Sequence, residues 1–316
     1  MYEPDVAIRT ARIALQGLRF HPGPAFGFPM GARAHALITD LPAFDHVEPV
    51  AASLARGDTE ITELENPKVH SLRIVNRGRQ PVYLPVGTTL KGGGQNRMIS
   101  VPIIVEAGST REIDVNCVER GRWTAERHAR FVGLSTSPSS IKRAKLAREH
   151  RNRSTNRRSN DQINVWRDVS ERLDTLGIRS PTEDLTESVE LPSHPWQRQV
   201  REAWMGASGC LVARRRGVLG LDAWGATTVR DAELEQTLFA YALDFGLPKA
   251  RPVEPRLPAF DRALDRLREA DRWSVRQSGD AALVDFRCGR GRLGGSAVVY
   301  GERLIHLSIV PARSDA

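Results

Sequence analysis

The chain has 316 residues, of which 40% are hydrophobic and 27% charged, and its formal net charge is +8. This length allows one large domain or two ordinary ones with a substantial core. No apolar run reaches the roughly 18–20 residues of a membrane span, and the first residues lack the apolar stretch and small-residue cleavage site of a signal peptide. We therefore expect residence in the cytoplasm. The positive charge favours anionic partners but identifies none.

The first part of the chain, residues 1–134, is predicted to be a mainly β module. Gly- and Pro-rich loops fill much of residues 1–45, and period-two alternation then begins at residues 60–64 and 69–75. Further strand-like runs cover residues 98–105 and 111–118, with turn residues between them and no helical segment. Short strands joined in this way are typical of an antiparallel β-sandwich or jelly-roll-like unit.

Residues 135–160 are predicted to form a basic, flexible linker, because cations dominate and apolar residues are few. An arginine-rich mobile segment can also bind the phosphates of RNA or DNA. The arginines available for such a role are Arg143, Arg148, Arg151, Arg153, Arg157 and Arg158. A charged linker, a solvated helix and a nucleic-acid contact all remain open.

The remainder, residues 161–316, is predicted to be an α+β module. Helical periodicity covers residues 163–176, 196–204, 234–245 and 258–270, and Gly177 stands where the first of these helices should end. Two segments that begin at Gly209 and Gly295 each read as a β-hairpin with a Leu-rich second strand. The whole chain is therefore expected to have an α+β fold with repeated hairpins.

Two polar, glycine-containing turns are the leading candidates for a binding site. Such turns let backbone N–H groups approach an anion, while arginine pairs phosphate and tryptophan stacks on a planar ring. The candidate ligand-binding residues are Lys91, Gly93, Gly94, Gln95, Asn96, Arg97, Arg120, Arg122 and Trp123. The alternatives are a simple bend at a sheet edge for the first turn and surface ion pairs for the second.

Evidence for catalysis is weaker. Cys117 could serve as a nucleophile if a histidine lay beside it, and Glu119 is the other candidate catalytic residue. The three cysteines match neither a disulfide framework nor a zinc pattern, and no metal site is predicted. The glycines of residues 289–294 match the GxGxxG motif of dinucleotide-binding proteins. They precede a second strand, however, where that motif requires a helix, so a hairpin loop explains them better. His306 lies in a strand and faces either the core or a pocket.

Several blocks resemble a known family. They are Gly92-Gly93-Gly94-Gln95-Asn96-Arg97, Val115-Asn116-Cys117-Val118-Glu119-Arg120-Gly121-Arg122-Trp123 and Gly220-Leu221-Asp222-Ala223-Trp224, with others over roughly residues 50–310. In this order they resemble the ADP-ribosylglycohydrolase- and rhodanese-phosphatase-associated protein domain family. The resemblance implies an association with enzymes that handle ADP-ribose and phosphate, and it implies no particular reaction.

Together, these features lead us to expect a cytoplasmic binding or accessory protein for a small, nucleotide-type anion, linked to ADP-ribose or NAD metabolism. Two alternatives stay open. One is an arginine-rich protein that binds RNA or DNA, and the other is a hydrolase of a nucleotide or ADP-ribosyl substrate. The sequence identifies no cofactor.

Overall fold

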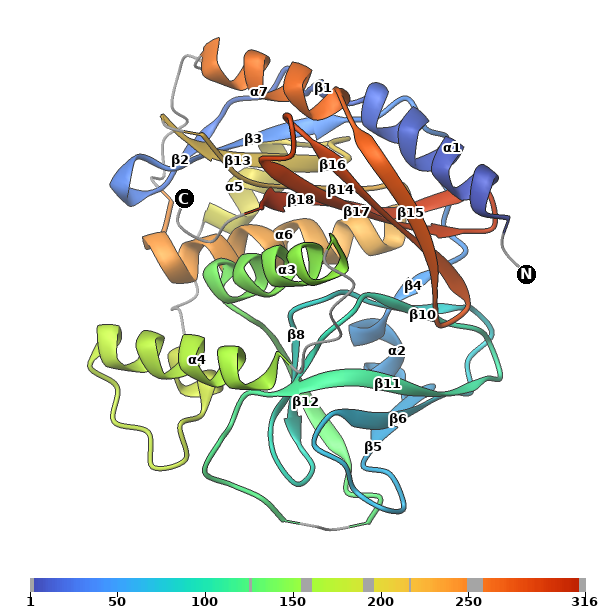
Figure 1. The fold of residues 1–316 in the computed structure, drawn as a ribbon, viewed down its shortest axis with the longest axis vertical. Coiled ribbons are helices and arrows are strands. Elements are labelled where there is room, and N and C mark those ends of the chain that lie inside the picture. The colour runs from blue at the N-terminus through green and yellow to red at the C-terminus, as the bar shows by residue number, and fades with distance from the viewer. Residues whose placement is uncertain are drawn as a thin grey trace.

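The computed structural model describes residues 3–124, 127–154, 161–189, 196–215, 217–248 and 258–312. In these ranges the chain forms two β layers, one above the other in Figure 1. Helix α6 (Thr227–Phe245) lies under the upper layer, and α3 (Ser139–Ser154) lies between the two layers on one side. Of the described helices, none is long and apolar enough to cross a membrane.

The upper layer is a nine-stranded antiparallel sheet with helices on both faces. Its strands in spatial order are β1 (Arg19–Phe20), β3 (Arg33–Ile38), β13 (Gly209–Arg214), β14 (Gly217–Trp224), β18 (Arg303–Pro311), β17 (Leu293–Tyr300), β16 (Ala281–Cys288) and β15 (Asp271–Ser278), and β2 (Phe26–Gly27) pairs with β3. Helices α1 (Pro4–Gln16) and α7 (Pro258–Arg268) cover one face, and α5 (Trp196–Ala203) and α6 cover the other. Because side chains alternate along a strand, Leu211 packs under α1 while its neighbour Val212 packs against α5 and α6.

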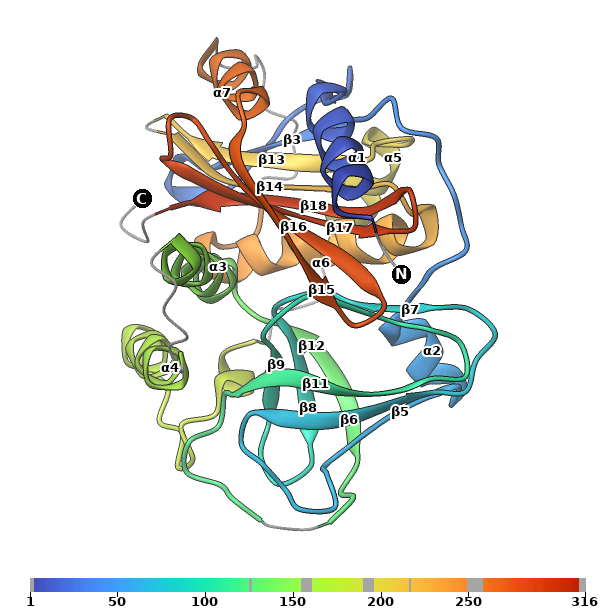
Figure 2. The ribbon, with the colours of Figure 1, turned by 45° about the vertical axis from the view of Figure 1, so that its right-hand side comes forward.

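The lower layer is a nearly closed barrel (Figure 2). Its strands in order are β12 (Phe131–Thr136), β8 (Thr88–Gly92), β9 (Arg97–Ile99), β11 (Thr110–Cys117), β6 (Ser71–Asn76) and β5 (Thr59–Thr62). A bridge between Thr62 and Arg130 joins the two outer strands. The alternation predicted in β6 turns Leu72 and Ile74 into the apolar interior. A smaller sheet, β10 (Ile103–Val105), β7 (Val82–Leu84) and β4 (Glu48–Pro49), lies beside the barrel with helix α2 (Val50–Arg56).

The predicted fold class is confirmed. Both layers are antiparallel apart from the short parallel pair β4–β7, and the two predicted hairpins are β13–β14 and β17–β18, whose second strands pair with each other. The glycines of residues 289–294 form the β16–β17 turn. One difference concerns residues 1–45, which were expected to be mostly loop in the N-terminal module: β1 and β3 extend the upper sheet instead, because β3 pairs with β13.

The prediction of a flexible linker over residues 135–160 is wrong for residues 139–154, which form helix α3. The apolar side chains of Ile141, Leu146 and Ala147 are buried, so this segment does contribute to packing. Asp244, at the end of α6, accepts hydrogen bonds from Ser140 N (2.6 Å) and from the Ser139 hydroxyl, so it satisfies free donors at the start of α3.

Part of the positive charge of α3 is paired with acids: Glu149 in α3 itself, Asp161 at the start of the next helix, α4 (Gln162–Leu176), and Asp168 within α4. Arg148 pairs with Asp161 (2.8 Å) and Asp168 (2.7 Å), and Lys145 pairs with Glu149 (2.9 Å). Two short 3-10 helices, η1 (Pro29–Gly31) and η2 (Leu185–Ser188), complete the described elements. The predicted contacts of Arg157 and Arg158, and the side chain of Arg153, lie outside the described residues.

Candidate functional site

The two predicted turns lie side by side. The glycine loop connects β8 to β9, the second turn follows β11, and β9 pairs with β11 so that Arg97 stands opposite Cys117. Past the strand ends, Val118 N donates to Asn96 O at 3.0 Å. Glycine is needed in the loop because it runs so close to its neighbours. A Cβ on Gly94 would lie 2.4 Å from the carbonyl oxygen of Thr124, and one on Gly93 would lie 2.3 Å from the ring of Phe131.

Glu119 is the centre of the contacts between the turns. Its carboxylate accepts two hydrogen bonds from Arg122 (2.8 and 2.7 Å), one from Asn96 N (3.0 Å) and one from the Thr182 hydroxyl (3.1 Å). Burial by itself would raise the pKa of Glu119, but these donors favour the ionised form and the net result is a lowered pKa. A carboxylate with this many partners is a structural anchor and not an available acid or base.

Arg97 is also held internally. Its side chain and that of Glu63 are both fully buried, with 3.4 Å between Arg97 Nη2 and Glu63 Oε1. Gln95 Oε1 accepts a hydrogen bond from Arg97 Nη1, and Gly94 N donates to Glu63. Burial lowers the pKa of Arg97 and raises the pKa of Glu63, and each partner opposes the shift of the other.

The amide side chains of the loop face protein partners as well. Gln95 Nε2 donates to the Glu119 carbonyl oxygen (3.0 Å), and Asn96 Nδ2 donates to Asp184 (3.0 Å). Arg122 Nη1 donates to the Gly93 carbonyl oxygen (2.9 Å). These donors could reach a ligand only if buried hydrogen bonds were broken.

The outer members of the predicted set remain accessible. Arg120 is 58% exposed and pairs with Glu183 at 3.6 Å, while Trp123 is 43% exposed and covers the guanidinium of Arg97 at 5.4 Å. Lys91 is half-buried. Thus the structure brings the two turns together, and most of their polar groups are used in hydrogen bonds and ion pairs within the protein.

Cys117 does not have the surroundings of an activated thiol. It is fully buried, its Sγ donates to the Glu119 carbonyl oxygen at 3.1 Å, and burial raises its pKa. A nucleophilic cysteine needs a lowered pKa and access to substrate.

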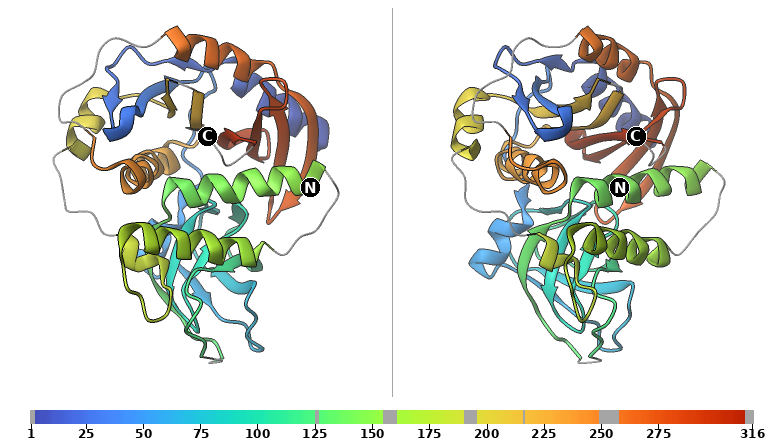
Figure 3. Two further views of the ribbon diagram at one scale, coloured as in Figure 1. Left: turned by 60° about the vertical axis from the view of Figure 1, so that its left-hand side comes forward. Right: turned by 90° about the vertical axis from the view of Figure 1, so that its left-hand side faces the viewer.

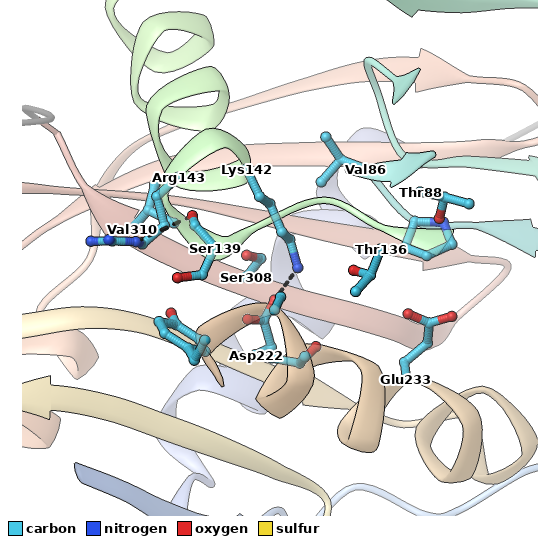
Figure 4. A pocket seen from close by; sticks show the side chains of 14 residues that line it. Val86, Thr88, Thr136, Ser139, Lys142, Arg143, Asp222, Glu233, Ser308 and Val310 are labelled. Atoms are coloured by element: carbon cyan, nitrogen blue, oxygen red, sulfur yellow. Dashed lines mark hydrogen bonds and ion pairs between the residues drawn. The ribbon is translucent and has the colours of Figure 1, made fainter. Parts of the chain in front are cut away.

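A second polar cluster lies where the two layers meet, and it is shown in Figure 4. Lys142 of α3 points from above toward Asp222 of β14, with 3.3 Å between Nζ and Oδ1. The same carboxylate oxygen lies 2.9 Å from His306 Nε2 on β18, and His306 Nδ1 lies 2.8 Å from the hydroxyl of Tyr83 on β7. A network of polar contacts therefore connects α3, the upper sheet and the small sheet beside the barrel.

In this polar network the Asp222 carboxylate is held in its ionised form. Burial by itself would raise the pKa of Asp222, but Lys142 and His306 outweigh it and the pKa is lowered. Burial lowers the pKa of His306, which keeps the imidazole neutral near pH 7. The arrangement that satisfies both contacts has His306 Nε2–H donating to Asp222 and Nδ1 accepting from Tyr83. Trp224 stacks on the imidazole at 5.1 Å.

Glu233 of α6 faces a small cavity that Lys142 and Asp222 also line. It makes no hydrogen bond or ion pair with any residue that the structure describes. Burial raises its pKa to about 7, with a smaller rise from Asp222 and an opposing effect from Lys142. The cavity that these residues line, together with Thr136 and others, has a volume of about 20 Å³, enough for about one water molecule.

A much larger groove, of about 710 Å³, opens beside the cavity. It runs between α3 and α4, which lie alongside each other in Figure 3, and it ends at the last turn of α6. Five arginines and three carboxylates line it: Arg143, Arg148, Arg151, Arg167, Arg172, Asp168, Glu171 and Asp244. Arg143 lines both the groove and the small cavity.

Arg143 differs from its neighbours in the groove. Arg148 and Arg172 are fixed by carboxylates, the latter by Asp244 at 3.0 Å. Arg143 donates only to the Ser139 carbonyl oxygen (3.3 Å) and pairs with no carboxylate in the ranges that the structure describes. A half-buried arginine without a counterion at the wall of a groove is suited to binding an anionic ligand.

Sequence reasoning did not single out this cluster as a site. Lys142 falls within the predicted basic segment, residues 135–160, and His306 is predicted to face the core or a pocket. A signal was present, because Asp222 is a charged residue inside the otherwise apolar run of residues 218–224. Among the described residues, no group of three or more His, Cys, Asp or Glu side chains could hold a metal ion.

Comparison with known proteins assigns the chain to a family. The model of the ARG and Rhodanese-Phosphatase-superfamily-associated Protein domain matches residues 36–310, and the chain belongs to this family. No curated protein and no solved structure matches it. The matched region contains both polar turns, the cavity and the groove.

Proposed function

We propose that this member of the ARG and Rhodanese-Phosphatase-superfamily-associated Protein family binds a phosphate-bearing, nucleotide-type anion in the groove between α3 and α4. The observation that carries the proposal is the unpaired guanidinium of Arg143 on the groove wall. A volume of about 710 Å³ lies within the range of small-molecule sites. The surplus of arginine over carboxylate in the lining favours a negatively charged ligand.

The proposed site is not at the two turns that the sequence first indicated. Their buried donors are already used by Glu63, Glu119 and Asp184, whereas the groove offers a cation with no acidic partner among the described residues. The pairing of Arg148 and Lys145 with acids also breaks up the positive face of α3, which favours a compact ligand over a nucleic-acid strand.

ADP-ribose is the first ligand to test. We read the ARG of the family description as ADP-ribosylglycohydrolase, and an ADP-ribose-type compound carries two phosphates for the arginines and a planar base. The support for the proposal is therefore the shape and charge of the groove together with this reading of the family name.

Isothermal titration calorimetry of the full chain at about 50 mM salt would test the proposal, with ADP-ribose, NAD and AMP as ligands and a short RNA oligonucleotide for comparison. We expect the chain to bind ADP-ribose, and Arg143→Gln to weaken binding at least about tenfold, since a charge-assisted contact contributes roughly 1.5–3 kcal/mol. Arg120→Gln removes an exposed arginine from the predicted turn and is the matched control; its affinity should change less than about twofold.

Three results would contradict the proposal. They are the absence of binding to any of the small ligands, loss of binding in Arg120→Gln but not in Arg143→Gln, and salt-sensitive binding to the RNA alone. The last result would favour the arginine-rich nucleic-acid alternative.

A further inference from the structure

The barrel of the lower layer is closed by few contacts between its two outer strands, β5 and β12. A bridge joins Thr62 to Arg130, and Glu63 N donates to the Ala129 carbonyl oxygen at 2.9 Å. Past these contacts the strands separate, and no other strand in the described ranges pairs with the outer edge of either one. Each outer edge therefore presents backbone donors and acceptors that an added strand could use.

A second groove, of about 510 Å³, opens where β5 and β12 separate. We call it the barrel groove. Its walls come from the two strands and from α2, which lies beside β5 in the lower layer (Figure 2). Most of the side chains that line it are apolar, among them Leu54, Ile61 and Leu134. The barrel groove is therefore suited to apolar side chains that project from an added strand.

Strand β12 has the sequence of an edge that can accept a partner. No charged residue or proline occurs from Phe131 to Thr136, although edge strands commonly carry such residues to prevent pairing. A bulge between Phe131 and Gly133 gives β12 an extra residue, Val132, whose side chain lines the barrel groove and is 87% exposed. An exposed valine beside a free backbone edge offers an apolar contact to a docked strand.

The lining of the barrel groove has a surplus of positive charge. Glu60 pairs with Arg77 through one carboxylate oxygen and with Arg130 through the other, each at 2.8 Å. One carboxylate therefore serves two arginines, and both arginine side chains are more than half exposed. An acidic side chain on a docked strand would complete the charge pairing at this place.

We propose that the free edge of β12 and the barrel groove bind an extended segment of a partner protein, which adds a strand to the barrel. The segment would match the six residues of β12 in length. It would carry apolar side chains at alternate positions and an acidic residue beside Arg77 and Arg130. Main-chain hydrogen bonds would supply the pairing, and the alternate side chains would supply the specificity.

The proposal does not depend on the anion site between α3 and α4. The barrel groove shares no lining residue with that site, so either surface can be occupied or altered without changing the contacts of the other.

The test begins with a displayed library of random peptides, each of about ten residues, selected on the full chain. The affinity of the most enriched peptide is then measured by fluorescence anisotropy. We expect the enriched sequences to have apolar residues at alternate positions with Asp or Glu next to them. Replacing that acid with its amide should weaken binding and should make it less sensitive to salt.

Val132→Asp should weaken binding of the selected peptide at least about tenfold, because a charge replaces the apolar contact beside the edge. Ile163→Asp is the matched control. Ile163, on α4, is 75% exposed and lies outside the barrel groove, so its replacement should change the affinity by less than about twofold. Both side chains are exposed, so both variants should fold, which circular dichroism would verify.

Arg130→Gln tests the charge complementarity separately. It should weaken binding of the acidic peptide by about threefold, because an exposed ion pair contributes little. It should leave the affinity of the amide version of the peptide unchanged. Equal effects on both peptides would overturn the assignment of an acidic residue to this end of the segment.

Hydrogen exchange measured by mass spectrometry would locate the bound peptide. Strand addition should slow exchange in β12, whose outward backbone groups gain partners, and should leave β17 of the upper sheet unchanged. Protection confined to α3 and α4 would overturn the proposal, as would the absence of any enriched peptide or wild-type affinity in Val132→Asp. Light scattering covers one more occupant. A wild-type dimer that Val132→Asp converts to a monomer would assign the edge to a second copy of this chain and would also overturn the proposal.

Discussion

Replacing Glu119 with glutamine tests whether the two polar turns are held together by that carboxylate. Wild-type Glu119 accepts four hydrogen bonds, two of them from Arg122. A glutamine has one acceptor oxygen, and its NH₂ group would face an N–H donor of Arg122, so the ion pair is lost and at least one donor is left unsatisfied.

The size of the stability loss in Glu119→Gln depends on how deeply the ion pair with Arg122 is buried. Removing one partner of a fully buried ion pair costs roughly 3–5 kcal/mol, but Arg122 is 34% exposed and can turn partly toward water. We therefore expect Glu119→Gln to lower the free energy of unfolding by about 2–4 kcal/mol. Arg120→Gln, one residue further along, loses an exposed pair with Glu183 and a cation–π contact with the ring of Trp166 (5.6 Å), and it should cost about 1 kcal/mol.

Urea unfolding followed by far-UV circular dichroism would measure both changes at pH 7. The folded pKa of Glu119 is lowered, so the stability that its ionised form contributes is present above the unfolded pKa, about 4.3, and is lost as pH falls through the folded pKa. The difference between the wild type and Glu119→Gln should therefore shrink below about pH 4. A change at pH 7 no larger than that of Arg120→Gln would refute this account of the turns.

Three other predictions concern the buried groups. Cys117 should not react with a thiol reagent in the native protein at pH 8, because it is buried with a raised pKa, and rapid labelling before unfolding would contradict this. Lys142→Met should destabilise the protein by about 3–5 kcal/mol in urea unfolding, because it leaves Asp222 buried without its cation, and adding Asp222→Asn should recover part of the loss; no recovery would mean that the pair is not coupled. Glu233 has a folded pKa raised to about 7, so the stability of the folded state is greatest below the unfolded pKa of this group and falls as pH rises to about 7. Glu233→Gln should therefore raise stability at pH 8, by at most about 4 kcal/mol, and change little at pH 4. Equal thermal-melting shifts at the two pH values would contradict the last prediction.

The strands were predictable because their information is local. Alternation within a few residues, as in β6, shows which side chains turn inward, and glycine turns mark where strands end. The two polar turns could also be expected to lie near each other, since both interrupt strands of the same predicted antiparallel unit.

The use of the turn side chains could not be predicted, because their partners are distant in sequence. Arg97 pairs with Glu63, 34 positions away, and Asn96 with Asp184, 88 positions away. The same limit applies to α3, whose arginine-rich sequence is typical of a solvated segment. Only the fold shows that Asp161 and Asp168 neutralise Arg148, and that Asp244 stabilises the start of the helix.

The cavity depends on still longer connections. Lys142, Asp222 and Glu233 belong to three elements that meet only when the two layers pack together. A charged residue in an apolar strand suggests that a partner exists, but it does not identify which of the 46 lysines and arginines provides it.

The most direct test of the central claim is a crystal structure of the full chain with ADP-ribose. Our account predicts electron density for the diphosphate in the groove between α3 and α4, in contact with the guanidinium of Arg143. Density beside Arg120 and Trp123 instead, or an empty groove at a ligand concentration that saturates binding in solution, would contradict it.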